Sequence, residues 1–178
     1  MLILVTGGSR SGKSSFALEL AAARPAPRLF LATARALDDE MKERVRVHQA
    51  ARGPGWELVE EPVEVPAALR AARLRAQTIV IDCVTLWLSN LLLARDSFEE
   101  TDAGAHAREL LAAAAGDAAV VVVTNEVGSG IVPENALARR FRDCAGRANQ
   151  VLAAGADEAY LLVSGLPIRL KPPRGRDG

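Results

Sequence analysis

The sequence predicts an α/β fold in which helices cover both faces of a mostly parallel sheet. Five short runs rich in Val, Ile and Leu alternate with Ala-rich segments that are long enough to form helices. The runs are almost continuously apolar, as strands buried on both faces are, whereas a half-exposed strand alternates polar and apolar residues. Strands that alternate with helices are typical of parallel sheets with right-handed crossovers. The predicted strands are residues 2–5, 29–32, 78–81, 119–123 and 159–163, with a candidate edge strand at 58–61.

The helices expected between these strands are supported by residues in their first turns. Asp38, Asp39 and Glu40 place acids where a helix dipole favours them. Pro66 stands near the start of another segment, where its missing N–H costs nothing. The predicted helices are residues 13–23, 38–52, 66–76, 84–94, 102–115 and 134–154.

Composition bounds the class of protein. The chain has 178 residues, of which 49% are hydrophobic, so it can form a core and is not a disordered chain. The formal net charge is +0, which argues against a nucleic-acid partner. No apolar run reaches the roughly 20 residues that a membrane span needs, and no basic segment precedes the first strand. We therefore expect a cytoplasmic protein, with a frayed tail at 172–178 that lacks apolar residues.

A phosphate-binding motif follows the first predicted strand. Residues 7–14, Gly-Gly-Ser-Arg-Ser-Gly-Lys-Ser, match G-x-x-x-x-G-K-[ST], and a predicted helix follows them. In such a loop, backbone N–H groups and the helix N-terminus converge on phosphate oxygens. Lys13 is expected at the β- and γ-phosphates, and the Ser14 hydroxyl at Mg²⁺. Residues 1–171 are therefore predicted to form a single P-loop nucleotide-binding domain.

Asp82 follows the apolar run 78–81. A carboxylate at the end of a buried strand can order Mg²⁺ directly or through water, so Asp82 is the second candidate metal ligand. The same side chain could instead cap the helix that is predicted to begin near Val84. The two cysteines, Cys83 and Cys144, fit no zinc spacing and are interpreted as buried thiols.

The two histidines differ in their surroundings. His106 stands in a polar, Ala-rich helix and is interpreted as solvent-exposed. His48 has Arg44 and Arg52 one turn away on the same predicted helix face. The two cations disfavour imidazolium, and neutral imidazole is the nucleophilic form. The guanidiniums could also hold phosphate oxygens. From the pattern alone, a surface histidine on an Arg-rich helix remains the other interpretation.

A glycine-containing loop at 124–133 follows the strand at 119–123. Loops at the carboxyl ends of parallel strands build the ligand crevice, although an ordinary strand-to-helix connection fits as well. Arg147 and Asn149 are expected to extend a polar face on the next helix. Trp56 and Trp87 could flank a large ligand, but core packing is the favoured interpretation.

Several separate segments together resemble the bifunctional adenosylcobinamide kinase / adenosylcobinamide-phosphate guanylyltransferase family of cobalamin biosynthesis. The most specific are Thr-Asn-Glu-Val-Gly-Ser-Gly-Ile-Val-Pro-Glu-Asn at 124–135 and the predicted helix of His48. The resemblance extends from Met1 to about Lys171. The other matching segments are 3–14, 32–33, 37–41, Trp56 with Glu60, 82–83, 90–92, 140–143 and 146–150.

The resemblance implies a P-loop NTPase fold of the RecA-like type and two reactions. ATP or GTP first phosphorylates the hydroxyl of adenosylcobinamide. GTP then gives GMP to adenosylcobinamide-phosphate through a GMP–histidine intermediate, which yields adenosylcobinamide-GDP and pyrophosphate. The histidine that matches the family motif is His48. The family also implies a homotrimer.

The nucleotide contacts implied by the family fall on the phosphate loop, the segment after the second strand, the residues after the histidine, and two acids. Some relatives carry Glu where this chain has Asp82, and either carboxylate can serve Mg²⁺. In this sequence the contacts are Gly7, Gly8, Ser9, Arg10, Ser11, Gly12, Lys13, Ser14, Ala32, Thr33, Ala34, Gln49, Ala50, Ala51, Arg52, Glu60 and Asp82.

Some alternatives stay open on the sequence. Asp82 and Glu126 are both candidates for the base that takes the proton of the acceptor hydroxyl. A single-activity kinase would need no His48. A regulatory GTP switch usually carries Asn-Lys-x-Asp, whereas residues 124–127 read Thr-Asn-Glu-Val. A nucleic-acid ATPase is disfavoured by the neutral charge.

Overall fold

The computed structural model describes residues 1–34, 55–95 and 97–172. The helix expected at 38–52 therefore lies outside the described residues, and so do residues 173–178 of the expected tail.

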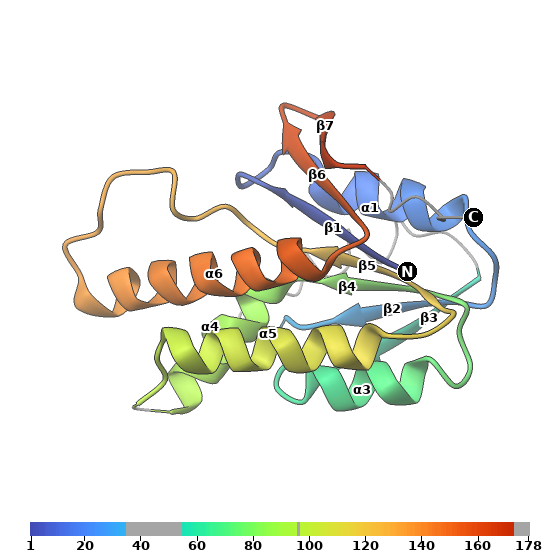
Figure 1. Ribbon diagram of the computed structural model, residues 1–178, viewed down its shortest axis with the longest axis horizontal. Helices are drawn as coiled ribbons and strands as arrows, with labels where there is room; N and C mark the ends of the chain where they lie inside the picture. Colours follow the sequence, from blue (N-terminus) through green and yellow to red (C-terminus); the bar gives the residue numbers. More distant parts are fainter. Residues whose placement is uncertain (35–54, 96, 173–178) are drawn as a thin grey trace.

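Seven strands form one sheet in the order β3-β2-β4-β5-β1-β6-β7 (Figure 1). Every neighbouring pair is parallel except β6 and β7, which pair antiparallel at one edge. The five expected strands are confirmed, and the candidate edge strand is β3 at the opposite edge of the sheet. The strands are β1 Leu2–Gly7, β2 Arg28–Ala32, β3 Trp56–Glu60, β4 Thr78–Asp82, β5 Ala119–Val123, β6 Glu158–Val163 and β7 Leu166–Lys171.

Helices lie on both faces of the sheet, as the sequence predicts (Figure 1). One face is covered by α1, and the other by helices that include α3, α5 and α6. Each described helix agrees with its expected position to within a few residues. The helices are α1 Lys13–Ala22, α3 Val65–Ala72, α4 Val84–Ala94, α5 Glu100–Ala114 and α6 Ala136–Gly155. In the described part of the chain, no helix has both the length and the apolar character needed to cross a membrane.

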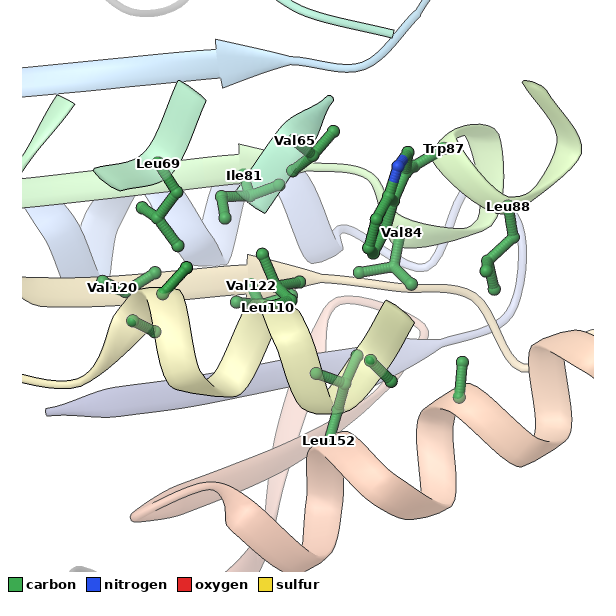
Figure 2. Close-up of a cluster of buried hydrophobic side chains, with 14 of the residues drawn as sticks. Val65, Leu69, Ile81, Val84, Trp87, Leu88, Leu110, Val120, Val122 and Leu152 are labelled. Carbon is green, nitrogen blue, oxygen red and sulfur yellow. The ribbon is translucent and has the colours of Figure 1, made fainter. Parts of the chain in front are cut away.

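Strand β5 shows why the apolar runs are continuous. Val120 and Val122 belong to the larger core cluster, while Val121 and Val123 point to the other face and pack with α1. Figure 2 shows side chains of the larger cluster meeting from strands and helices. Trp87 lies there with 0% exposure, and its Nε1 donates to the Val63 carbonyl at 2.7 Å. Core packing is therefore the role of Trp87.

Strand β7 was missed from the sequence. Its residues are exposed or only partly buried, and Pro167 weakens the strand signal, although an edge strand tolerates proline. The hairpin signal is the two-residue connection Ser164-Gly165, with φ of 51° and 84°. Two consecutive residues with positive φ make the tight turn that favours β-hairpins. This turn joins β6 to β7 next to the phosphate loop.

The interpretation of His106 as solvent-exposed is wrong. Its side chain is 22% exposed and stacks on Phe98, with the ring centroids 5.8 Å apart. Trp87 meets the imidazole edge-to-face at 5.8 Å. The helix pattern did not predict this burial, because His106 on α5 packs between Phe98 and Trp87, which come from other segments. Apolar surroundings of this kind disfavour the charged imidazolium.

Protonation of His106 should therefore destabilise the fold. Burial, followed by the nearby Arg95 guanidinium, lowers the pKa of His106 from its usual 6.5, against the opposite effect of three carboxylates. The unfolded chain then binds the proton more readily, so the free energy of unfolding should fall as the pH drops below about 6.5. Urea unfolding at two pH values on either side of 6.5 measures this loss. His106→Gln should show a smaller loss than the wild type, and equal losses would contradict the assignment.

Candidate active site

The phosphate loop is a tight connection between β1 and α1. Gly12 has φ of 92° and Arg10 of 57°. A Cβ at Gly7 would lie 2.5 Å from the Leu162 carbonyl oxygen, so only glycine fits between β1 and β6. The loop is also tied to the β6–β7 turn, because Gly165 N donates to the Ser11 carbonyl at 3.0 Å. The hairpin therefore helps to hold the loop in place.

Lys13 begins α1 and is buried, with 6% exposure. Its ammonium donates to the Gly8 carbonyl and to Ser11 Oγ, so the charge lies within the loop. Burial lowers the pKa of Lys13, and the nearby Cys83 and Asp82 act in the opposite direction. A buried ammonium is costly unless anions compensate it, which makes this position suited to phosphate.

The segment after β2 is fixed beside Asp82 at the end of β4. Thr33 N donates to the Asp82 carbonyl at 3.1 Å. Thr33 Oγ1 donates to the Cys83 carbonyl at 2.8 Å and accepts from Cys83 N at 2.9 Å. Asn90 Nδ2 donates to the Thr33 carbonyl at 2.9 Å. The expected contact residues Ala32, Thr33 and Asp82 therefore lie together at the carboxyl edge of the sheet.

Asp82 does not occupy the cap position of the following helix. The N-cap of α4 is Cys83, and no side chain caps it. Cys83 and Cys144 are buried, as expected, and burial is the largest cause that raises the pKa of each thiol to about 11. Thiols of this kind are not reactive at neutral pH.

The proposed metal ligands are compatible with Mg²⁺. Ser14 is partly exposed in the first turn of α1, and Asp82 is partly exposed at the end of β4. A hydroxyl and a carboxylate are hard oxygen ligands, and Mg²⁺ typically takes one or two of them with phosphates and water. Among the described residues, no cluster of three or more His, Cys, Asp or Glu could hold a metal alone. Mg²⁺ bound with a nucleotide does not require such a cluster.

Other expected site residues lie farther away or outside the described chain. Glu60 is exposed at the end of β3, where it pairs with Ala32 of β2. Strand β3 is the edge strand of the sheet, separated from β1 by three strands. The remaining residues, which stay predictions, lie outside the described residues: Arg44, His48, Gln49, Ala50, Ala51 and Arg52.

A polar network beside the loop was not found from the sequence. Asn149 was expected on a polar face of α6, but it is buried, with 8% exposure, whereas Arg147 is exposed. The Asn149 Oδ1 accepts from Thr124 Oγ1 at 2.7 Å, and the Asn149 Nδ2 donates to Glu126 Oε1 at 3.3 Å. Thr6 Oγ1 donates to the same Glu126 oxygen at 2.8 Å. The sequence did contain a sign of this network: Asn149 is a polar residue that shares the buried face of its helix with Ala145 and Leu152.

A cleft of about 500 Å³ lies between this network and the β6–β7 hairpin. One side is polar and includes part of the phosphate loop. The other side is mostly apolar and comes from the hairpin. The polar side consists of Thr6, Gly8, Ser11, Glu126 and Ser129. The hairpin side consists of Leu161, Leu162, Val163, Ser164 and Leu170.

Comparison with known proteins identifies a matching family and several relatives. A family model described as cobinamide kinase / cobinamide phosphate guanyltransferase matches residues 3–170. The bifunctional adenosylcobalamin biosynthesis protein CobU of Salmonella typhimurium strain LT2 is 44% identical, over 96% of this chain and 100% of that protein. The CobU protein of Escherichia coli K12 is 41% identical over the same shares. The CobP protein of Pseudomonas aeruginosa is 39% identical, over 94% of this chain and 96% of that protein.

Solved structures of ATPases share the fold. An ATPase from a bacterial type III secretion system has a TM-score of 0.62 at 15% identity, covering 91% of this chain and 51% of that one. The ATPase domain of a second protein has a TM-score of 0.57 at 14% identity, covering 99% of this chain and 78% of that one. At these identities the likeness concerns the fold alone, and it confirms the expected P-loop NTPase fold.

Proposed function

Because this chain belongs to the cobinamide kinase / cobinamide phosphate guanyltransferase family, we propose that it phosphorylates adenosylcobinamide with ATP or GTP and then transfers GMP to the product. GTP is the guanylyl donor of the second step: its GMP part passes first to His48 and then to the acceptor phosphate, and pyrophosphate leaves. The family match and the relatives identify the chain as a bifunctional enzyme of cobalamin biosynthesis.

The observation that carries the proposal is Lys13 buried inside a strand–loop–helix unit, with the Asp82 carboxylate close enough to influence its charge. In phosphoryl transfer a protein mainly positions the reactants and neutralises charge. The amides of Gly7 to Ser14 and the Lys13 ammonium would hold the β- and γ-phosphates. Ser14 and Asp82 would hold Mg²⁺, which supplies positive charge at the transferred phosphoryl group.

The guanylyl step requires a nucleophile. His48 would attack the α-phosphorus of GTP, so that the new N–P bond replaces the bond to the departing pyrophosphate. A phosphate oxygen of adenosylcobinamide-phosphate then displaces the imidazole and takes the GMP. Covalent catalysis of this kind divides one difficult transfer into two easier ones. Ala32 to Ala34, Gln49 to Arg52, and Glu60 would complete the nucleotide contacts.

The proposal extends to the organisation of the protein. We treat residues 1–171 as one nucleotide-binding domain that assembles into a homotrimer. The proposed location is the cytoplasm, which is the expectation from the sequence.

Two labelled nucleotides test the function. With γ-labelled GTP, the label should appear on adenosylcobinamide. With α-labelled GTP and no acceptor, the protein itself should carry an acid-labile label, which adenosylcobinamide-phosphate then removes. A protein that phosphorylates the acceptor but never takes the α-label would be a single-activity kinase. Failure to label adenosylcobinamide would contradict the kinase assignment.

A further inference from the structure

The cleft beside the phosphate loop joins a carboxylate to an apolar wall, and neither belongs to the nucleotide contacts described above. We propose that this cleft receives the hydroxyl-bearing arm of the phosphoryl acceptor, and that Glu126 takes the proton of the hydroxyl. The inference rests on the proposed kinase function and adds to it the place of the acceptor and the identity of the base.

The position of Glu126 is fixed relative to the phosphate loop. Glu126 follows β5, the strand next to β1, and its N donates to the Gly7 carbonyl at 3.0 Å. The lysine of a phosphate loop contacts the β- and γ-phosphates, and here the Lys13 ammonium lies at the Gly8 carbonyl. Gly8 and Glu126 line the same cleft. The transferred phosphoryl group and the carboxylate are therefore expected to face one shared space.

The Glu126 carboxylate is also held in one orientation. Thr6 Oγ1 donates to Oε1 at 2.8 Å, and Asn149 Nδ2 donates to Oε1 at 3.3 Å. Asn149 is itself fixed by Thr124 and by its own bond to the Asn125 carbonyl at 3.0 Å. Both bonds fall on one oxygen, and no residue of the described chain donates to Oε2. Because Glu126 lines the cleft, we infer that this oxygen accepts the proton of the ligand hydroxyl.

The same geometry separates the two candidate bases. Asp82 ends β4, and β5 lies between that strand and β1. Asp82 acts electrostatically on Lys13 and does not line the cleft. The carboxylate of Asp82 is thus placed for the metal, and that of Glu126 for the acceptor. An analogous division occurs in protein kinases, where one Asp serves Mg²⁺ and another accepts the hydroxyl proton.

The apolar wall suits a large acceptor with a small polar arm. Leu166, Ile168 and Leu170 alternate along β7 and are 71%, 50% and 57% exposed, and Val163 pairs with Leu166 across the hairpin. Alternation and pairing place all four side chains on one face. A cleft of about 500 Å³ can hold a ligand of drug size, but a corrinoid is much larger. We place the arm in the cleft and the ring against this exposed strip.

The step balances without any further reactant. The hydroxyl oxygen of the acceptor attacks the γ-phosphorus and forms the new O–P bond. The bond from the γ-phosphorus to the β–γ bridging oxygen breaks, and the nucleoside diphosphate leaves. The hydroxyl proton passes to Glu126 and then to solvent.

The decisive variant is Glu126→Gln, which keeps the size of the side chain but removes the basic oxygen. Phosphorylation of adenosylcobinamide should fall by at least about 100-fold in kcat, the usual contribution of a general base. Nucleotide affinity and GMP transfer to pre-formed adenosylcobinamide-phosphate should stay near wild type, which a merely misfolded protein would not show. The matched control is Glu134→Gln, an exposed carboxylate of the same loop, and it should keep full kinase activity.

The wall is tested with Leu170→Gln, at a side chain that is 57% exposed. This variant should raise the KM for adenosylcobinamide and leave the KM for the nucleotide unchanged. Leu74→Gln, at an 89% exposed leucine just beyond α3, is the control and should change neither constant. An unchanged KM for adenosylcobinamide in Leu170→Gln would contradict the proposed contact between the corrinoid ring and the hairpin.

The outcomes separate the two levels of the proposal. A wild-type protein that does not phosphorylate adenosylcobinamide overturns the proposed function and this inference with it. An active wild type with a Glu126→Gln variant of similar kcat overturns the inference alone. If Glu126→Gln does not bind nucleotide, Glu126→Asp replaces it: the shorter acid should lower the kinase kcat and spare GMP transfer, and an unchanged kcat overturns the inference.

Discussion

Replacement of Lys13 with alanine should lower the rate of phosphoryl transfer to adenosylcobinamide by at least about 100-fold. The Lys13 ammonium is buried within the phosphate loop, where its bonds to Gly8 and Ser11 hold it near the position of the phosphates. Charge that develops on the transferred phosphoryl group would lose its nearest fixed cation. Steady-state kinetics with γ-labelled nucleotide measures the effect.

Two features make the Lys13 result interpretable. Burial lowers the pKa of Lys13, so folding carries a desolvation cost for this charge that alanine does not incur. Lys13→Ala should therefore fold with about wild-type stability while it loses activity. Lys171→Ala is the control, because this lysine lies outside the phosphate loop and donates to the Ala153 and Ala154 carbonyls at the end of α6. It should keep the wild-type rate of phosphoryl transfer. Comparable rates of phosphoryl transfer in wild type and Lys13→Ala would show that Lys13 has no role in the kinase step.

The parallel core was predictable because its physical cause is local. Val120 to Val123 must be apolar at every position, since alternate side chains pack on opposite faces of the sheet. The phosphate loop was predictable because its motif is contiguous and because Gly12, with φ of 92°, meets a backbone requirement of the loop itself. Such constraints leave a mark on a short stretch of sequence, so they can be recognised before the fold is known.

The features that could not be predicted from the sequence depend on contacts between distant segments. The position of Asn149 in its helix indicates burial, but its bonding partners Thr124 and Glu126 come from a distant segment, so the polar network could not be predicted from the helix alone. His106 was misjudged for the same reason, because Phe98 and Trp87 enclose it from outside its helix. Among the residues with a proposed role, Glu126 was named but could not be chosen, since its place in the cleft depends on the β6–β7 hairpin.

Replacement of His48 with alanine should lower GMP transfer by at least about 10³-fold and abolish the acid-labile GMP adduct, since a covalent route needs its nucleophile. Phosphorylation of adenosylcobinamide should persist, because the residues proposed for that step are Lys13, Ser14, Asp82 and Glu126. Mass spectrometry of the protein after incubation with GTP detects the adduct, and γ-labelled GTP follows the kinase step in the same preparation.

The sequence offers a matched control for this experiment, because the chain contains only two histidines. His106 packs between Phe98 and Trp87 on the side of the sheet opposite α1. His106→Gln should keep the adduct, and His48→Ala should lose it. An adduct that survives in His48→Ala would refute the assignment of the nucleophile, while the loss of both activities in that variant would contradict the proposal that His48 acts in the second step alone. Selective loss of GMP transfer is the result that a two-step enzyme with one covalent histidine requires.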